Sequence, residues 1–335
     1  MTKWFVHNPR LHGDWDKHLA ALTGSNFFQT KAWGQVKEAS GWCVLPMIAL
    51  AENKAVAMAL VLHRPQPLLG RMVWLPGGIA GDLSLPATNL IQGLKKELGA
   101  AWLYMRANFV GFTENSVLTL QQHTNGWRKP SVNIGSGLSL SYNTARDEQT
   151  RIAATSVNWR HNLKRSRKYG LSFVKWDEPD VDQIVSIYRS MEMHKGLSPQ
   201  VPEVELGAIF KYLKDGLVLY RCVNMQGETI AFRAYARWGD QAFDLLAAAN
   251  PSARKVYASH GLLWQLFNDC FEKGILRYDL GGVEPQQNKG VFDFKKGTSA
   301  ELFTYLGEWE AASPKWVKSI ANCMLHLKRR KIVQR

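Results

Sequence analysis

The stretch that decides the fold is Val218-Leu-Tyr-Arg-Cys-Val, followed by the turn Gln226-Gly-Glu and by Ile230-Ala-Phe-Arg-Ala-Tyr-Ala-Arg. Both runs are rich in β-branched and aromatic residues, and the polar turn between them predicts an antiparallel pair of strands. Strand-like runs also occur at residues 241–246 and 276–280. Between these two, apolar residues recur at helical spacing and stop at Gly274. They are Leu262, Leu263, Leu266, Phe267, Cys270 and Phe271.

The first half of the chain repeats this order. Strand-like runs occupy residues 45–50, 55–62 and 71–76, and a helix around 89–98 leads into a strand at 102–106. Corresponding elements are offset by about 170–175 residues. Helix, β-meander, helix and strand in this order indicate an α+β fold. We therefore expect two tandem GNAT-like acyltransferase domains, each a mixed central sheet flanked by helices.

A polar stretch at residues 141–149 interrupts the apolar pattern between the two halves. It predicts a first domain at residues 1–147 and a second at 148–300. Residues 301–335 are expected to complete the first domain. Within them, Trp316, Ile320 and Met324 recur at helical spacing. This tail helix is expected to dock on the body or to lie on a membrane surface.

The net charge of +14 is concentrated in two segments. Residues 151–168 carry six basic and no acidic side chains, and residues 315–335 carry seven and none. The rest of the chain has a net charge of only +1. This distribution favours a polyanionic partner, either nucleic acid or an anionic membrane surface, and two solvated helix faces are the alternative.

Several classes of protein are not indicated. The four cysteines lie far apart and the histidines show no paired metal spacing, so we expect reduced thiols and no metal. Neither a signal peptide nor a spanning segment is evident, which predicts a soluble, cytoplasmic protein. A GNAT enzyme holds the CoA pyrophosphate on a glycine-rich turn, whereas residues 251–261 read PSARKVYASHG. The acyl donor is therefore expected to be carried on something other than CoA.

Four ordered motifs resemble the Fem family of aminoacyl-tRNA-dependent transferases, which build peptidoglycan cross-bridges. They are FFQTKAWGQVK at 27–37 with Gly41-Trp42, WRHNLKRSRKYG at 159–170, YDLGG at 278–282 with Gly290 and FKKG at 294–297, and YLGEW at 305–309. The chain is similar to the compact members that lack a coiled-coil arm. The resemblance implies two GNAT-like domains, no cofactor, and aminoacyl-tRNA as co-substrate.

The implied reaction is attack of an amine on the aminoacyl ester. The acceptor would be a cell-envelope precursor, such as a peptidoglycan stem peptide. Because the ester is already activated, the protein needs mainly to orient the substrates and stabilise an oxyanion. By resemblance, Lys295 is the oxyanion stabiliser and Phe294 its packing neighbour. The alternative for Lys295 is a surface lysine in a Lys-Lys-Gly turn.

Further site residues follow from the same resemblance and from strand alternation. Lys37 is the expected cation for the acceptor, with a solvated helix lysine as the alternative, and Trp33 is favoured as a core residue over a ligand. Arg233, Tyr235 and Arg237 share one predicted strand face and line either an acceptor cleft or a salt-bridged sheet surface. Candidates for the tRNA backbone are Arg160, Lys164, Arg165, Arg167 and Lys168.

The sequence also departs from the family pattern. Asn108 stands where many members have an aspartate and cannot act as a general base, so the amine must lose its proton elsewhere. Lys195, in His194-Lys-Gly, replaces the usual Arg-Asp-Gly and keeps only a cation for the acceptor. Phe243 occupies the place of an acceptor-side aromatic.

Two other functions stay open. One is a GNAT-type N-acyltransferase that acts on an amino sugar or an envelope precursor with acyl-CoA or an acyl carrier protein. The other is an inactive relative that binds RNA or membrane. In either case the basic C-terminal tail is a candidate for peripheral contact with the anionic inner membrane.

Overall fold

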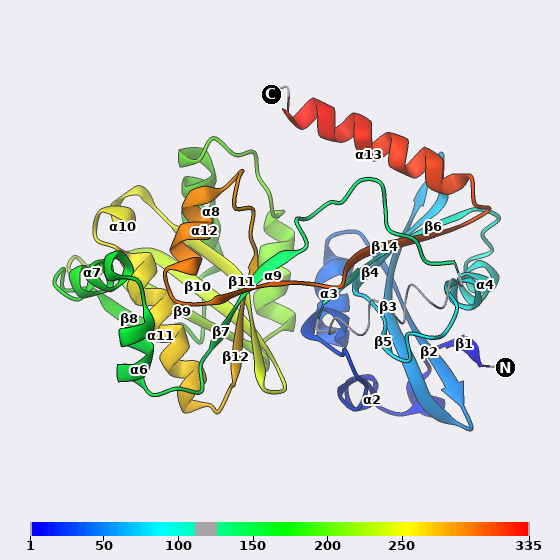
Figure 1. The fold of residues 1–335 in the computed structure, drawn as a ribbon, viewed down its shortest axis with the longest axis horizontal. Helices are drawn as coiled ribbons and strands as arrows, with labels where there is room; N and C mark the ends of the chain where they lie inside the picture. Colours follow the sequence, from blue (N-terminus) through cyan, green and yellow to red (C-terminus); the bar gives the residue numbers. More distant parts are fainter. Residues whose placement is uncertain (1, 111–125, 334–335) are drawn as a thin grey trace. The chain divides into compact units, whose positions relative to one another are not determined.

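The computed structural model describes residues 2–110 and 126–333, which divide into two compact units (Figure 1). Unit 1 comprises residues 1–137 and 304–335, and unit 2 comprises residues 138–303. Each unit is built on a seven-stranded sheet. The expected fold class, two tandem GNAT-like domains with mixed sheets, is confirmed.

The sheet of unit 1 has the order β1-β2-β3-β4-β6-β14, and β5 pairs with β3. Among the strands described for this unit, only β4 and β6 run parallel, and the crossover helix α4 (Ala87–Leu98) joins them. Trp4, Met47, Leu90 and Met105 are among the buried residues of its core. The strands are β1 (Lys3–Val6), β2 (Cys43–Ala51), β3 (Lys54–Gln66), β4 (Gly70–Gly77), β5 (Ala80–Gly81), β6 (Leu103–Phe109) and β14 (Gly307–Ser313). The helices before β2 are α1 (Pro9–His12), α2 (Trp15–Ala20), the 3-10 helix η1 (Phe27–Gln29) and α3 (Lys31–Ala39).

The sheet of unit 2 has the order β13-β7-β12-β11-β10-β9-β8. Its strands are β7 (Leu138–Asn143), β8 (Ser172–Lys175), β9 (Leu217–Val223), β10 (Thr229–Trp238), β11 (Gln241–Ala249), β12 (Arg277–Gly282) and β13 (Glu301–Thr304). Its helices are α6 (Glu148–Ala154), α7 (Val157–Ser166), α8 (Val181–His194), α9 (Glu203–Tyr212), α10 (Pro251–Lys255), α11 (Ala258–Glu272) and α12 (Lys289–Lys296). The predicted meander is thus β9, β10 and β11.

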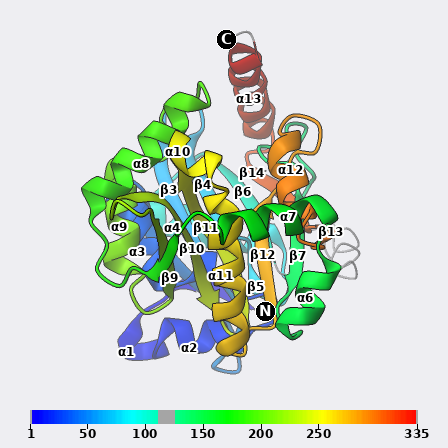
Figure 2. The same ribbon diagram turned by 90° about the vertical axis from the view of Figure 1, so that its left-hand side faces the viewer.

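Helix α11 lies over the strands of unit 2, as Figure 2 shows. Its close approach to β8 requires a glycine, because a Cβ on Gly261 would lie 2.0 Å from Cζ of Phe173. Leu262, Leu266 and Phe267 of the predicted apolar stripe are buried against the sheet. Five of the six predicted stripe residues are therefore buried as the spacing predicts, whereas Phe271, near the end of the helix, is 43% exposed.

The unit boundary differs from the predicted one in position. Residues 138–143 form β7, which pairs with β12 and so belongs to the second sheet, whereas the polar stretch placed the boundary at residue 147. The chain returns to unit 1 through β14, which pairs with β6.

The tail forms α13 (Val317–Val333) and docks on unit 1. Val317 and Ala321 are buried, and Ile320 and Met324 pack beside them against Leu69 and Tyr104. Trp316, which the spacing placed on the same stripe, is 45% exposed. The apolar face of the helix is therefore used by the protein itself.

Candidate active site

Lys295 is a buried lysine at the end of α12, not a surface residue of a turn. It is 9% exposed, and its ammonium donates hydrogen bonds to the carbonyl oxygens of Gly281 and Gly282, at 3.4 and 3.2 Å. Gly281 has φ +73°, a left-handed conformation that glycine adopts readily at the end of β12. The Tyr-Asp-Leu-Gly-Gly motif of the sequence thus supplies both carbonyl oxygens that bind this lysine.

Two carboxylates and one guanidinium surround the Lys295 ammonium. Burial has the largest effect on the pKa of Lys295 and lowers it. The nearby Asp244 carboxylate raises the pKa, the Arg233 guanidinium lowers it, and Asp279 raises it with the smallest effect. Desolvation disfavours the charged form, so the net direction is downward. A lysine in this setting can donate a strong hydrogen bond to a developing negative charge.

The lowered pKa of Lys295 predicts a pH dependence. If the ammonium form stabilises the oxyanion, the transfer rate falls as the pH rises through a pKa below the ordinary lysine value of 10.5. Arginine stays protonated across this range, so Lys295→Arg should keep some activity and lose this alkaline decline. The measurement is kcat/KM against pH for both proteins. The same alkaline decline in both proteins would contradict the assignment.

Arg233 and Asp244 form a buried ion pair next to Lys295. Nε and Nη2 of Arg233 donate to the two carboxylate oxygens at 2.8 and 2.6 Å, and the side chains are 7% and 9% exposed. The hydroxyl of Tyr278 also donates to Asp244, at 3.0 Å. Asp244 was not singled out from the sequence, where it is one acidic residue in an apolar run.

The three residues predicted on one face of β10 have different surroundings. Arg233 is ion-paired, and Tyr235 is buried with its hydroxyl hydrogen-bonded to Asp269. Arg237 is exposed and donates to the carbonyl oxygen of Gly239. The structure therefore brings only Arg233 together with Lys295.

Phe294 belongs to an aromatic group on the same side of unit 2. Its ring centroid lies 5.0 Å from that of His260 and 6.2 Å from that of Trp159, and the Arg233 guanidinium lies 5.7 Å from it. Burial lowers the pKa of His260 to about 4, and Nδ1 has no partner among the described residues. His260 is therefore neutral at neutral pH. No sequence pattern marks this residue, because it is a lone histidine in an apolar helix.

Lys37 and Trp33 lie together in unit 1, on α3. Lys37 is 9% exposed, and its Nζ lies 4.6 Å from the ring centroid of Trp33 and 5.8 Å from that of Trp74. Lys37 is thus a buried helix lysine held over indole rings, not a solvated one. Trp33 is 6% exposed, which agrees with its interpretation as a core residue.

The five tRNA candidates are all exposed, on α7 or just after it. The side chain of Arg165 donates to the Tyr257 hydroxyl at 2.9 Å, and that of Arg167 contacts Glu148 at 3.2 Å. Arg151, which contributed to the same charge count, is instead 3% exposed and donates to Asn268. The exposed basic surface therefore carries five cations, not six.

The amino end of α11 lies beside this surface. Tyr257 precedes the helix in a left-handed conformation, and no side chain caps the helix. Lys195 follows α8 and is exposed, and its pKa is lowered by desolvation from the surrounding protein and, to a lesser extent, by Arg254. The uncapped backbone N–H groups at the amino end of α11, with cationic side chains nearby, form a setting that favours binding of an anion.

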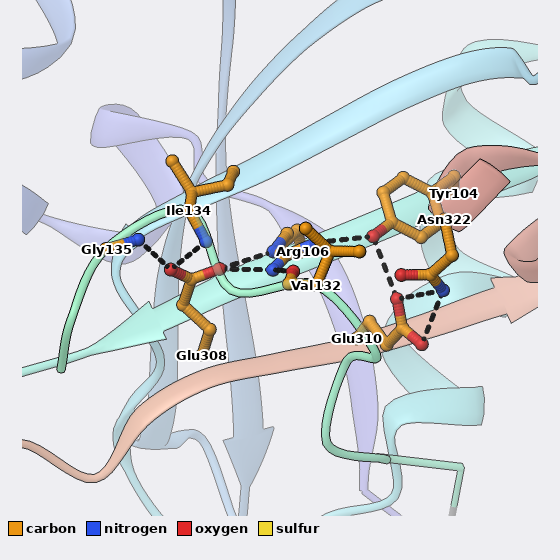
Figure 3. Close-up of polar contacts among 8 residues, drawn as sticks. All are labelled: Tyr104, Arg106, Val132, Ile134, Gly135, Glu308, Glu310 and Asn322. Carbon is orange, nitrogen blue, oxygen red and sulfur yellow. Dashed lines mark hydrogen bonds and ion pairs between the residues drawn. The ribbon is translucent and has the colours of Figure 1, made fainter. Parts of the chain in front are cut away.

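A second buried polar cluster lies in unit 1 (Figure 3). The Arg106 guanidinium contacts Glu308, the Tyr104 hydroxyl and the carbonyl oxygen of Val132. The other Glu308 oxygen accepts hydrogen bonds from the backbone N–H groups of Ile134 and Gly135, at 2.8 and 2.7 Å. This cluster fixes residues 132–135 against β6 and β14. Asn108, which occupies the expected position of a family aspartate, is half-buried on β6 opposite Glu308.

The described residues contain no group of His, Cys, Asp and Glu side chains placed to hold a metal ion. Nor does any helix among residues 2–110 and 126–333 combine the length and hydropathy that crossing a bilayer requires.

The architecture is shared with several solved structures. The chain is similar to the crystal structure of FemX, with a TM-score of 0.74 and 13% identity, covering 92% of this chain and 96% of that one. It is also similar to the C-terminal domain of a putative lysylphosphatidylglycerol synthetase from Agrobacterium fabrum, with a TM-score of 0.58, 13% identity and coverage of 91% and 94%. A tandem GNAT protein from the clavulanic acid biosynthesis pathway gives a TM-score of 0.55, 8% identity and coverage of 93% and 98%. These likenesses define a tandem GNAT-like fold.

A family model matches part of the chain. Residues 230–324 match the model of the FemAB family, and this segment contains Arg233, Asp244 and Lys295. The match confirms the resemblance to the Fem family and, with the fold, supports an acyltransferase. No curated protein sequence matches the chain at a significant level.

Proposed function

We propose that this protein transfers an amino acid from aminoacyl-tRNA to an amine of a cell-envelope precursor, such as a peptidoglycan stem peptide. The observation that carries the proposal is the buried Lys295 ammonium, held on the Gly281 and Gly282 carbonyls within the segment that matches the FemAB family. It supplies a preorganised cation where the ester carbonyl would develop negative charge.

The chemistry then needs little beyond orientation. The acceptor amine attacks the ester carbonyl, and the oxyanion of the tetrahedral intermediate is stabilised by Lys295. Collapse of the intermediate forms the amide and breaks the ester bond, and the ribose hydroxyl leaves with a proton. The amine proton passes to solvent or to the leaving oxygen, since Asn108 cannot accept it. Lys37 is the proposed cation for phosphate or carboxylate groups of the acceptor. Lys195, Arg233 and Arg237 are further candidates for binding the acceptor.

The proposed donor predicts a salt-sensitive contact with α7. Lys164 and Lys168 are exposed, and we expect Lys164→Ala/Lys168→Ala to weaken tRNA binding about tenfold at moderate salt. The slope of log affinity against log salt should fall by about 1.5, because two phosphate contacts are lost. Filter binding of charged tRNA over a series of salt concentrations measures both.

Lys211→Ala/Lys214→Ala is the matched control, because these two lysines are also exposed and lie in unit 2. The same proteins are then assayed for transfer of labelled amino acid from total charged tRNA to extracted envelope precursors. Label on a precursor supports the proposal. No tRNA binding at any salt would overturn it and favour an acyl-CoA or acyl carrier protein donor. Binding without transfer to any precursor would favour an inactive RNA-binding relative.

A further inference from the structure

One end of unit 1 exposes two tryptophans in contact with each other. The ring centroids of Trp102 and Trp316 lie 4.8 Å apart in a T-shaped arrangement, and the two residues are 42% and 45% exposed. Trp102 precedes β6 and Trp316 precedes α13, so the pair joins segments that are distant in sequence. Large aromatic residues left this exposed together mark an interaction surface.

A third exposed apolar residue belongs to the neighbouring turn. Leu68, in the turn between β3 and β4, is 56% exposed. The same turn packs on Trp102, because the Arg71 N–H donates to the Trp102 carbonyl oxygen at 3.1 Å and a Cβ on Gly70 would lie 2.5 Å from that oxygen. We call Leu68, Trp102 and Trp316 the tryptophan patch.

The segments that carry the patch are strongly basic. Residues 64–71, 95–102 and 313–320 contain six lysines and arginines and one acidic residue, Glu97. Lys95 reaches this end of α13, where its Nζ lies 3.4 Å from the Ser313 hydroxyl, and Lys315 is exposed. Residues 315–335 carry seven basic and no acidic side chains. Exposed apolar side chains on segments rich in lysine and arginine match a partner whose surface is anionic and whose interior is apolar.

We propose that the tryptophan patch docks unit 1 on an anionic lipid bilayer. Indole rings prefer the headgroup level, where the ring is half-buried and its N–H stays wet, and each nearby Lys or Arg adds attraction to anionic lipid. The apolar face of α13 cannot make this contact, because Val317 and Ala321 are already packed on unit 1. The contact is therefore made at the start of α13, with the basic tail supplying charge.

The composition of the patch favours lipid over RNA. Leu68 cannot stack on a base, and in a T-shaped pair the edge of one indole covers the face of the other. Protein–RNA stacking needs open aromatic faces. The proposal goes beyond transfer itself, and only its consequence, that a lipid-linked acceptor would be met at this surface, rests on the proposed function.

The test is flotation of the purified full chain with vesicles, in the absence of tRNA and acceptor. We expect binding to vesicles that contain phosphatidylglycerol, weaker binding at high salt, and little binding to pure phosphatidylcholine. Leu68→Ser and Trp316→Ala should each weaken binding about fivefold to tenfold, and Lys315→Glu about fivefold. Leu11→Ser, at another exposed leucine of unit 1, and Lys54→Glu are the matched controls and should bind like the parent protein.

Leu68→Ser guards against a folding artefact, because Leu68 is exposed and lies outside the buried clusters. Binding that is unchanged in Leu68→Ser and Trp316→Ala, or equally weakened in Leu11→Ser, would overturn the proposal. The proposal would also be overturned if no vesicles bound while Leu68→Ser and Trp316→Ala weakened tRNA binding in a separate filter assay, a result that would assign the surface to RNA. Transfer to a water-soluble amine should be the same in Leu68→Ser and the parent protein, so failure of vesicle binding is distinguishable from failure of the proposed transfer.

Discussion

We expect Lys295→Ala to lower kcat/KM for aminoacyl transfer by a factor of about 10²–10³, because the oxyanion loses one preorganised hydrogen-bond donor. The fold should survive the substitution, because the neighbouring carboxylates keep other partners. Asp244 retains Arg233 and Tyr278, and Asp279 retains the Ser139 hydroxyl and the Gly281 N–H. Single-turnover rates with charged tRNA, together with thermal unfolding, measure the two quantities separately.

Lys289→Ala provides the matched control in the same helix. Lys289 is exposed and forms an ion pair with Asp293 on the same helix, so its replacement should leave the rate unchanged. Lys296→Ala is a stricter control because this lysine is the adjacent residue, and its ammonium donates to the Ala300 carbonyl oxygen. A Lys295→Ala protein that is folded and retains its rate would exclude the assigned role and show that another group stabilises the oxyanion.

The repeating order of strands and helices is the part of the structure that local sequence determines. The runs at 218–223 and 230–237 become β9 and β10, and the stripe from Leu262 to Phe271 lies within α11. These elements are set by side-chain periodicity within one segment. By contrast, the partners of β7 and β13 depend on pairing over more than a hundred residues, and no local pattern encodes them.

The burial of the candidate site was less accessible to sequence reasoning. Lys295 and Lys37 each had a surface lysine as the alternative, and each is 9% exposed. Lys295 contacts the carbonyl oxygens of Gly281 and Gly282, which lie at the end of β12, and β12 reaches this position only by pairing with β11 and β7. The role of Asp244 was hidden for a similar reason, because its partner Arg233 lies on the neighbouring strand, eleven positions earlier in the sequence. The partner of a single polar residue in an apolar run cannot be predicted until the pairing of the strands is known.

Arg233→Met should destabilise unit 2 by about 3–5 kcal/mol, because it leaves the Asp244 carboxylate buried without its bidentate partner. Urea unfolding, with hydrogen exchange of β10 and β11 to locate the loss, measures this. The double variant Arg233→Met/Asp244→Asn should recover about 2 kcal/mol or more. It removes the unpaired charge and keeps an acceptor for the Tyr278 hydroxyl. Failure of the second substitution to restore stability would show that Arg233 acts through packing, such as its contact with Phe294, and not through the ion pair.

The same pair of variants separates the two interpretations of Arg233 that the strand pattern allows. Once stability is restored, an unchanged KM for the acceptor identifies Arg233 as a positioning residue that holds Asp244 beside Lys295. A KM that stays raised in the stable double variant identifies it as a binding residue for an anionic group of the acceptor. Asp244 also raises the pKa of Lys295, while Arg233 lowers it. Replacing both therefore removes opposing effects, and the alkaline decline of the rate should shift less in the double variant than in either single one.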